Sequence, residues 1–212
     1  AKVDDSLKVA MNFFEKNVID KLIAGGLVAN LLLVAKGINI GNVNIEFLKK
    51  ELPDFEKLLD ISKNLLNKYG EKIILPVDFA INKDNKRFEI NIEELPIEYP
   101  IYDIGLDTIE IFKREIIKAK SIILNGPMGV YEIPDFSLGT VEIFKTISEV
   151  DAFKVAGGGH TISVISKLEL EKKFTHVSTG GGALISFLSG ENMPGLDALK
   201  LSKSKFSGGD KK

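Results

Sequence analysis

The stretch Lys154-Val155-Ala156-Gly157-Gly158-Gly159 reads as an apolar strand that runs directly into a glycine turn ahead of a helix. Three other stretches repeat this order, the last of them more weakly: Ile122-Ile123-Leu124-Asn125-Gly126-Pro127, His176-Val177-Ser178-Thr179-Gly180-Gly181-Gly182 and Leu22-Ile23-Ala24-Gly25-Gly26. Parallel strands that are each followed by a helix place such turns on one edge of a sheet. Glycine lets backbone N–H groups approach a ligand, and a helix N-terminus adds unpaired donors and partial positive charge. One run alone is better explained as a tight turn, but the set predicts an edge that binds a phosphate-bearing ligand.

Strands and helices alternate along the whole chain. Helices are predicted from just after Gly26 to Gly37 and over residues 5–18, 55–69, 107–118, 140–148, 161–168 and 182–188. Residues 73–75 read as a buried strand that residues 77–80 could continue, and residues 88–92 as a half-exposed strand after a polar turn over residues 82–86. This order predicts an α/β fold, a Rossmann-like three-layer domain with a mostly parallel sheet and helices on both faces.

The length and composition fit one large domain. The chain has 212 residues, of which 44% are hydrophobic, which is enough for a sizeable core. Residues 1–201 are assigned to this domain. Residues 202–212 form a polar, Lys-rich tail without an apolar period, and we expect them to be poorly ordered unless a partner holds them.

Composition also excludes several classes of function. The net charge is −2 with both signs mixed along the chain, so nucleic acid is not an expected partner, and no acidic tail indicates disorder. No apolar run is long enough to cross a membrane, and no signal peptide precedes the first helix, which together indicate a cytoplasmic protein. Cysteine is absent, which excludes disulfides, thiolate chemistry and zinc–cysteine sites.

One stretch of sequence identifies a protein family far more specifically than a pair of glycines does. Ile123-Leu124-Asn125-Gly126-Pro127-Met128-Gly129-Val130-Tyr131-Glu132, followed by Ile133-Pro134-Asp135-Phe136 and Gly139-Thr140, closely resembles the signature of phosphoglycerate kinases. Further strings resemble that family in order and spacing: Ala1-Lys2-Val3-Asp4-Asp5, Leu75-Pro76-Val77-Asp78, Asp103-Ile104-Gly105, Ser178-Thr179-Gly180-Gly181-Gly182 and Met193-Pro194-Gly195-Leu196-Asp197-Ala198-Leu199. The resemblance spans nearly all of residues 1–201, and its pattern is similar to archaeal members.

The resemblance implies one half of a two-domain enzyme, the C-terminal domain that binds ATP or ADP with magnesium. The whole enzyme transfers a phosphoryl group reversibly between 1,3-bisphosphoglycerate and ADP in glycolysis. The expected partners are the nucleotide and the N-terminal phosphoglycerate-binding domain of the same enzyme. The chain alone is expected to bind ADP or ATP without turnover. The alternative is a non-catalytic nucleotide-binding module or folding fragment. A dinucleotide-binding dehydrogenase domain is disfavoured because no G-x-G-x-x-G opens a helix here with an acidic residue about 20 positions on.

The resemblance also implies roles for particular residues. Lys2 and the run Gly180, Gly181 and Gly182 are expected to stabilise the phosphoryl group while it is transferred. The expected nucleotide-binding residues are Gly25, Gly26, Ile101, Tyr102, Asn125, Gly126, Pro127, Glu132, Gly157, Gly158, Gly159, His160 and Thr161. Among them Glu132 corresponds to a carboxylate that binds the ribose hydroxyls. Ile101 and Tyr102 fall in the adenine slot, although core packing explains them equally well. Thr161 could cap its helix or contact phosphate.

Two positions depart from the family pattern. His160 stands where an aspartate associated with magnesium is common, and Ser6 stands where many members have a second lysine. Neutral imidazole is a poor ligand for a hard cation, so no residue of the chain is predicted as a metal ligand. Lys8 is expected to point elsewhere. His176, on a strand, is interpreted as a structural histidine.

Overall fold

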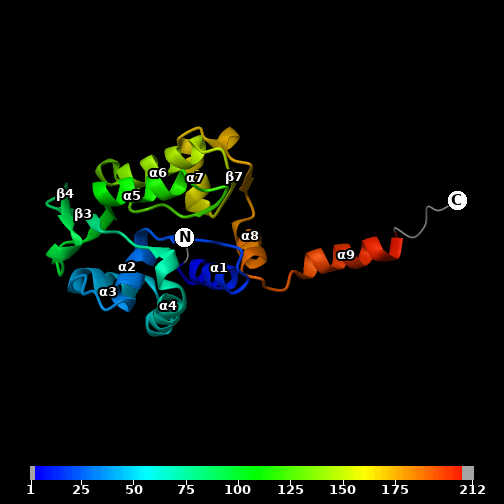
Figure 1. Cartoon of the computed structure of the whole chain (residues 1–212), viewed down its shortest axis with the longest axis horizontal. Coiled ribbons are helices and arrows are strands. Elements are labelled where there is room, and N and C mark those ends of the chain that lie inside the picture. Colours follow the sequence, from blue (N-terminus) through cyan, green and yellow to red (C-terminus); the bar gives the residue numbers. More distant parts are fainter. Residues whose placement is uncertain (1–2, 207–212) are drawn as a thin grey trace.

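The computed structural model describes residues 3–206, and it places helices on both sides of a set of short strands (Figure 1). On one side lie four helices: α1 (Val3–Glu15), α2 (Gly26–Ala35), α3 (Asn42–Glu51) and α4 (Phe55–Tyr69). On the other side lie three: α5 (Leu106–Ile116), α6 (Leu138–Glu149) and α7 (Gly159–Lys167). Short 3₁₀ turns cover Gly70–Lys72, Ile92–Glu94, Pro134–Phe136 and Glu171–Lys173. The α/β class predicted from the sequence is confirmed.

The strands divide into three small sheets rather than one continuous sheet. Two of these sheets are parallel: β1 (Leu22–Ile23) pairs with β2 (Ile73–Ile74), and β7 (Phe153–Gly157) lies between β6 (Ser121–Asn125) and β8 (His176–Ser178). The third is antiparallel, with β3 (Asp78–Lys83) between β4 (Lys86–Asn91) and β5 (Ile101–Ile104). The predicted single, mostly parallel sheet is therefore only partly present.

The side chains of β1 and β2 show how the layers are arranged. Leu22 and Ile73 pack into the hydrophobic cluster formed with α1–α4, whereas Ile23 and Ile74 pack into the cluster formed with α5–α7. Successive side chains of a strand point to opposite faces, so these strands separate two hydrophobic cores. The glycine turns at the strand ends therefore lie between two helical layers.

The antiparallel sheet corrects one sequence prediction. Residues 77–80 do not continue the strand that begins at Ile73, because β3 belongs to a different sheet and runs on to Lys83. The turn comprises only Asp84 and Asn85, whose φ angles are 54° and 60°. Positive φ at both central residues is the requirement of a tight two-residue hairpin, so the chain reverses directly into β4.

The helix boundaries follow local signals where these are strong. α4 ends at Tyr69 before Gly70, as predicted. α2 ends two residues before Gly37, which has a φ of 89° and donates its N–H to the Val34 carbonyl at 2.9 Å. Glycine adopts this left-handed conformation without the strain that a Cβ atom would cause, which explains the helix end.

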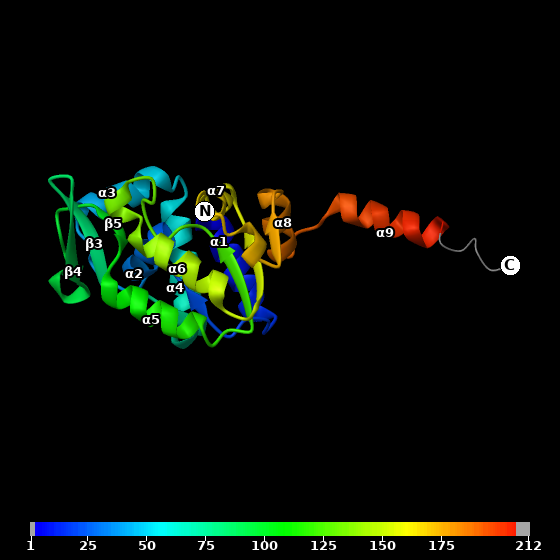
Figure 2. The same cartoon turned by 90° about the horizontal axis from the view of Figure 1, so that it is seen from above.

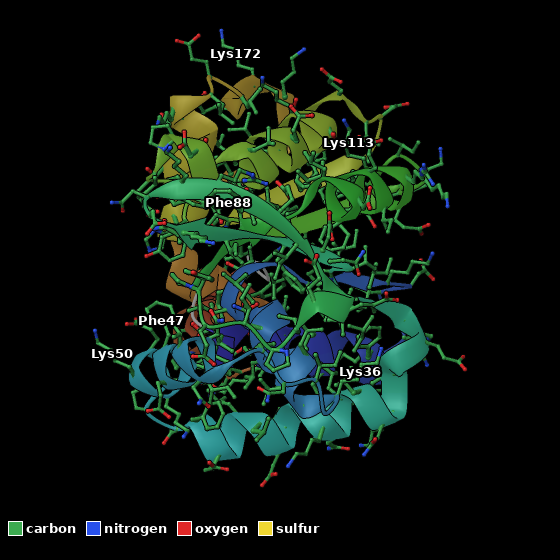
Figure 3. The ribbon with its side chains drawn as sticks, turned by 90° about the vertical axis from the view of Figure 1, so that its left-hand side faces the viewer. Lys36, Phe47, Lys50, Phe88, Lys113 and Lys172 are labelled. Carbon is green, nitrogen blue, oxygen red and sulfur yellow. The ribbon has the colours of Figure 1, made fainter. Side chains whose placement is uncertain are left out.

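Helix α3 was not predicted, since its apolar period is weak. Its buried polar residue Asn44 fixes its position. The Asn44 carboxamide donates to the Tyr99 carbonyl at 3.0 Å and accepts from the Ile101 N–H at 2.8 Å. Since Ile101 begins β5, these hydrogen bonds hold α3 against the antiparallel sheet. Figure 3 shows the exposed Phe47 and Lys50 on this helix.

The chain ends in two further helices. α8 (Gly181–Leu188) packs beside α1, and α9 (Pro194–Phe206) extends away from the rest of the molecule in both Figures 1 and 2. Residues 202–206, the start of the predicted polar tail, continue α9, and residues 207–212 lie outside the described part. None of the helices over residues 3–206 is both long and apolar enough to cross a membrane.

Candidate functional site

The glycine turns converge on two adjoining pockets. A Cβ atom on Gly181 would lie 3.2 Å from the Gly158 Cα, so the turns after β7 and β8 touch each other. The turn after β1 meets the one after β6, because the Gly26 N–H donates to the Met128 carbonyl at 2.8 Å. The four glycine runs recognised in the sequence thus lie together in space, as the parallel strand order predicts.

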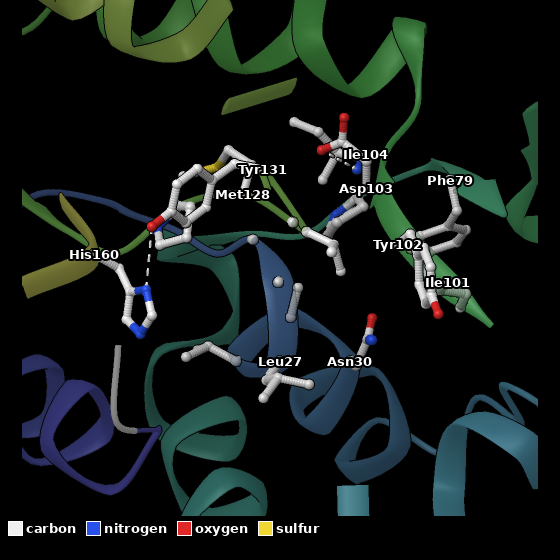
Figure 4. A pocket seen from close by; sticks show the side chains of 18 of the residues that line it. Leu27, Asn30, Phe79, Ile101, Tyr102, Asp103, Ile104, Met128, Tyr131 and His160 are labelled. Atoms are coloured by element: carbon white, nitrogen blue, oxygen red, sulfur yellow. Dashed lines mark hydrogen bonds between the residues drawn. The ribbon is translucent and has the colours of Figure 1, made fainter. Parts of the chain in front are cut away.

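The larger pocket, which has the greater number of lining residues, runs between α2, β5 and the loop after β6 (Figure 4). Eight of the predicted nucleotide-binding residues line it: Gly25, Gly26, Ile101, Tyr102, Asn125, Pro127, Glu132 and His160. His160 lies at one end, and Asn30 and Ile101 lie at the other (Figure 4). Apolar walls with a few polar groups are typical of a small-molecule site.

The smaller pocket adjoins the His160 end. It is lined by Asp5, Asn125, Gly158, Gly159, His160, Gly181, Gly182 and Ile185, so it shares Asn125 and His160 with the larger one. α7 begins at Gly159 and α8 at Gly181. Unpaired N–H groups and the positive ends of two helix dipoles therefore face one cavity, which favours an anionic group there.

Asn125 stands where the two pockets meet. Its amide Nδ2 donates to the Ser6 hydroxyl at 3.3 Å, so the serine that replaces the family's lysine supports this side chain. Gly158 has a φ of 94°, and a Cβ atom there would lie 2.8 Å from the Asn125 Oδ1. Glycine is thus needed at position 158 for both conformation and space. Lys8 forms an ion pair with Asp4 at 3.1 Å along α1, in agreement with the prediction that it points elsewhere.

Thr161 acts behind the site rather than at its surface. Its hydroxyl accepts a hydrogen bond from the Gly126 N–H at 2.7 Å, and the residue is fully buried. The N-cap of α7 is Gly158, so the alternative that Thr161 caps this helix is wrong. Gly126 has a φ of 106° and lies in the turn after β6, so this hydrogen bond from Gly126 to Thr161 holds that turn in place. Gly157 also lies behind the pockets, where a Cβ atom would come within 2.3 Å of Leu184.

His160 has two neighbours at the pocket wall. The Tyr131 hydroxyl lies 3.3 Å from the His160 Nδ1 (Figure 4). The Glu132 Oε1 lies 3.9 Å from the same nitrogen. All three side chains line the larger pocket. Tyr131 was missed as a site residue, although it lies inside the most specific string of the sequence.

A buried ion pair supports the wall formed by β5. The Asp103 carboxylate accepts hydrogen bonds from Arg87 on β4 at 2.9 Å and from the Gly139 N–H of α6 at 2.8 Å. Arg87 also donates to the Ile104 and Asp135 carbonyls at 3.0 and 3.1 Å. Burial raises the pKa of Asp103 above its ordinary value, although the Arg87 hydrogen bond opposes this shift. The pair ties the hairpin, β5 and the start of α6 together.

The remaining predicted residues are placed less directly. Gly180 is the N-cap of α8, next to the two pocket-lining glycines that follow it. Lys2 lies outside the described residues. The lining residues that were not predicted include Asp5, Asn30, Phe47 and Tyr131. Asn30 could have been noticed as a polar residue inside an apolar helix, whereas Phe47 lies on α3, a helix that was itself not predicted.

The described part of the chain offers few side chains that could contact a metal ion at the pockets. Over residues 3–206 no group of three or more histidine and acidic side chains is placed to hold a metal ion. Asp5 supplies a carboxylate at the wall of the smaller pocket. Magnesium bound with phosphates retains several water ligands and needs only one or two carboxylates.

This arrangement defines an α/β domain whose glycine-rich edge presents two helix N-termini to one cavity. The sequence profile described as "Phosphoglycerate kinase" matches residues 1–191, so the chain belongs to the phosphoglycerate kinase family. It is 50% identical over 208 residues to the phosphoglycerate kinase of Thermoplasma acidophilum and 47% identical over 210 residues to that of Pyrococcus abyssi. These matches cover 98% and 97% of this chain but 51% and 50% of the relatives, so the chain spans about half their length.

Solved structures support the same family. The crystal structure of phosphoglycerate kinase from Pyrococcus horikoshii superposes with a TM-score of 0.88 at 42% identity, over 97% of this chain and 51% of that one. The structure of phosphoglycerate kinase from Coxiella burnetii gives a TM-score of 0.77 at 30% identity, with the same coverage. The family resemblance stated from the motifs is thus confirmed, as is the coverage of about half the enzyme.

Proposed function

We propose that this chain is the C-terminal, nucleotide-binding half of a phosphoglycerate kinase. The observation that carries the proposal is the pair of joined pockets, with two helix N-termini at one end and apolar walls at the other. A nucleotide has the matching polarity, with an anionic phosphate chain at one end and a flat base at the other. The family membership supports the same assignment.

The pockets suggest an orientation for ADP or ATP. The phosphates would lie against the backbone N–H groups of Gly158–Gly159 and Gly181–Gly182, where two helix dipoles favour negative charge. The ribose would lie near Glu132, and the base between α2 and β5. Magnesium would accompany the phosphates and neutralise part of their charge, with Asp5 as the nearby carboxylate.

The proposed reaction needs positioning more than covalent chemistry. A terminal phosphate oxygen of ADP attacks the phosphorus of the acyl phosphate, the bond from phosphorus to the acyl oxygen breaks, and ATP and 3-phosphoglycerate result. Donors from Gly180, Gly181 and Gly182, together with Lys2, would stabilise the charge on the transferred group. The acyl phosphate would be held by the N-terminal domain, so closure of the two domains is required before transfer.

The isolated chain is therefore expected to bind nucleotide without catalysing transfer. Isothermal titration calorimetry with Mg-ADP tests binding, and an assay coupled to ATP formation from 1,3-bisphosphoglycerate tests turnover. We expect saturable binding with one site and no turnover above background. The mass of the sample must first be verified, so that a contaminating full-length enzyme is excluded. Turnover by the isolated chain would then contradict the proposal that transfer requires both domains. A non-catalytic nucleotide-binding module, the alternative function, predicts that joining the N-terminal domain also yields no activity.

His160 is proposed to contact phosphate and not magnesium. Replacing it with alanine should weaken ADP and Mg-ADP binding by the same factor, about threefold to tenfold, because one hydrogen bond is lost in each case. Titrations of both ligands with the wild type, His160→Ala and His160→Asn measure this. The asparagine variant, which keeps an N–H donor, should recover part of the affinity. A loss confined to Mg-ADP would assign His160 to the metal.

A further inference from the structure

We infer that the Asn30 side chain forms hydrogen bonds with the group at the 6-position of a purine base, and that it thereby determines which base the larger pocket prefers. The inference rests on the proposed nucleotide function, and it adds a specificity-determining residue to that site.

Asn30 is a buried amide in an apolar setting. It lies on α2 with 7% of its surface exposed, and the next three residues, Leu31, Leu32 and Leu33, are fully buried. Figure 4 shows its carboxamide pointing from α2 into the larger pocket, on the side of Ile101 and Tyr102. The small exposed fraction of Asn30 therefore faces the cavity.

The Asn30 carboxamide has no hydrogen-bond partner among residues 3–206. Asn44 offers a direct comparison, because it is also buried, at 4% exposure, yet its amide makes hydrogen bonds to the Ile40 and Tyr99 carbonyls and to the Ile101 N–H. A polar side chain in an apolar helix costs free energy unless a group in the cavity binds its amide, and leucine is a better helix former than asparagine. A ligand that supplies the missing hydrogen bonds would account for an asparagine at position 30.

The position of Asn30 selects the part of the ligand that it can reach. The phosphate-binding glycines and His160 lie at one end of the joined pockets, and Asn30 lies at the other (Figure 4). Asn30 is four residues beyond Gly26, about one helical turn deeper along α2. The walls beside it include Phe47, Phe79 and Ile101, which suit the flat faces of a base. Its amide would then meet the polar edge of that base.

An amide matches the 6-amino edge of adenine. The carboxamide oxygen can accept from the amino group while the amide N–H donates to a neighbouring ring nitrogen, a pairing common between asparagine and adenine. Purine riboside diphosphate has hydrogen in place of this amino group and is otherwise the same ligand. The difference in affinity between the two nucleotides therefore isolates the hydrogen bond to the 6-amino group.

The test compares ADP with purine riboside diphosphate by calorimetry on this chain. The wild type should bind ADP about tenfold more tightly than purine riboside diphosphate. Asn30→Leu and Asn30→Ala should weaken ADP binding about tenfold more than they weaken binding of purine riboside diphosphate, which shares only the ring-nitrogen contact, and should therefore remove most of this preference. Thermal unfolding of each variant confirms that the fold is retained, and leucine is expected to be well tolerated in this apolar helix.

Asn82→Leu provides a matched control. Asn82 is an amide on β3 whose oxygen is buried without a partner among the described residues, and it lines neither pocket. This variant should keep the wild-type preference for ADP. An unchanged preference in both folded Asn30 variants would overturn the inference while leaving nucleotide binding intact. Failure of the wild type to bind ADP at all would instead contradict the proposed function.

Discussion

Replacing Gly181 with valine should lower kcat/KM of the full two-domain enzyme by roughly a hundredfold or more, which is the usual effect of removing one transition-state donor. A Cβ atom at position 181 would lie 3.2 Å from the Gly158 Cα and 3.3 Å from its backbone nitrogen. Backbone cannot move aside as the end of a flexible side chain can, so the two glycine turns would separate. The N–H groups at the start of α8 would then leave their places beside the smaller pocket, where the proposed function puts the phosphates.

The cause is contact and not backbone strain, because the positive-φ glycines include Gly126 and Gly158 but not Gly181. Steady-state kinetics with thermal unfolding checks the prediction, since the fold should persist. Gly70→Val is the matched control, because Gly70 has a negative φ, open space around its Cβ position and a place outside both pockets. It should retain nearly the full kcat/KM. Unchanged kinetics in Gly181→Val would show that this run is only a turn.

Replacing Asp103 with alanine should lower the free energy of unfolding by about 3–5 kcal/mol, because it leaves a largely buried Arg87 without its partner. The Asp103 side chain is fully buried, and 15% of the Arg87 side chain is exposed. The Gly139 and Ile104 N–H groups would also lose their acceptor. Urea denaturation of this chain measures the loss.

A double variant, Arg87→Met with Asp103→Leu, should recover much of the lost stability, since no unpaired charge remains. A cost below about 1 kcal/mol for Asp103→Ala would contradict the structural role of this pair.

The raised pKa of Asp103 sets the sign of the pH dependence. A folded-state pKa above the unfolded value means that the folded protein binds the proton more tightly. The contribution of this carboxyl to stability is therefore fully present below the unfolded pKa and is lost as the pH rises through the folded pKa. Relative to Asp103→Asn, the wild type should gain stability as the pH falls from 7 toward 4. The opposite trend would show that the ion pair with Arg87, and not burial, dominates the titration of Asp103.

The structure agrees best with the predictions that rested on strong local sequence patterns. The apolar period and Gly70 predicted α4 to its last residue, and Gly37 ended α2 where a left-handed glycine was expected. The specific string after β6 carried the family resemblance, which the comparisons confirm. These features depend on short-range backbone geometry and side-chain spacing, so neighbouring residues suffice to predict them.

Long-range hydrogen bonds account for what was missed. α3 is held by Asn44 through bonds to Tyr99 and Ile101, more than 50 residues away in the chain. The hydroxyl of Thr161 turned inward to Gly126, although its sequence position fits a helix cap or a ligand contact equally well. Phe47 became a pocket residue only because α3 packs against β5.

The sequence by itself determined the α/β class, the glycine runs that end its strands and the family to which the chain belongs. Those properties follow from periodicity, from the special conformations of glycine and from the order of specific strings. Only the tertiary structure decided that the strands divide into three sheets, that Arg87 closes onto Asp103, and that the Asn30 amide faces a cavity while the similar Asn44 amide is fully paired. The reason is physical: a polar side chain acquires its role from the partners that folding brings within hydrogen-bond distance, and those partners are distant in the sequence.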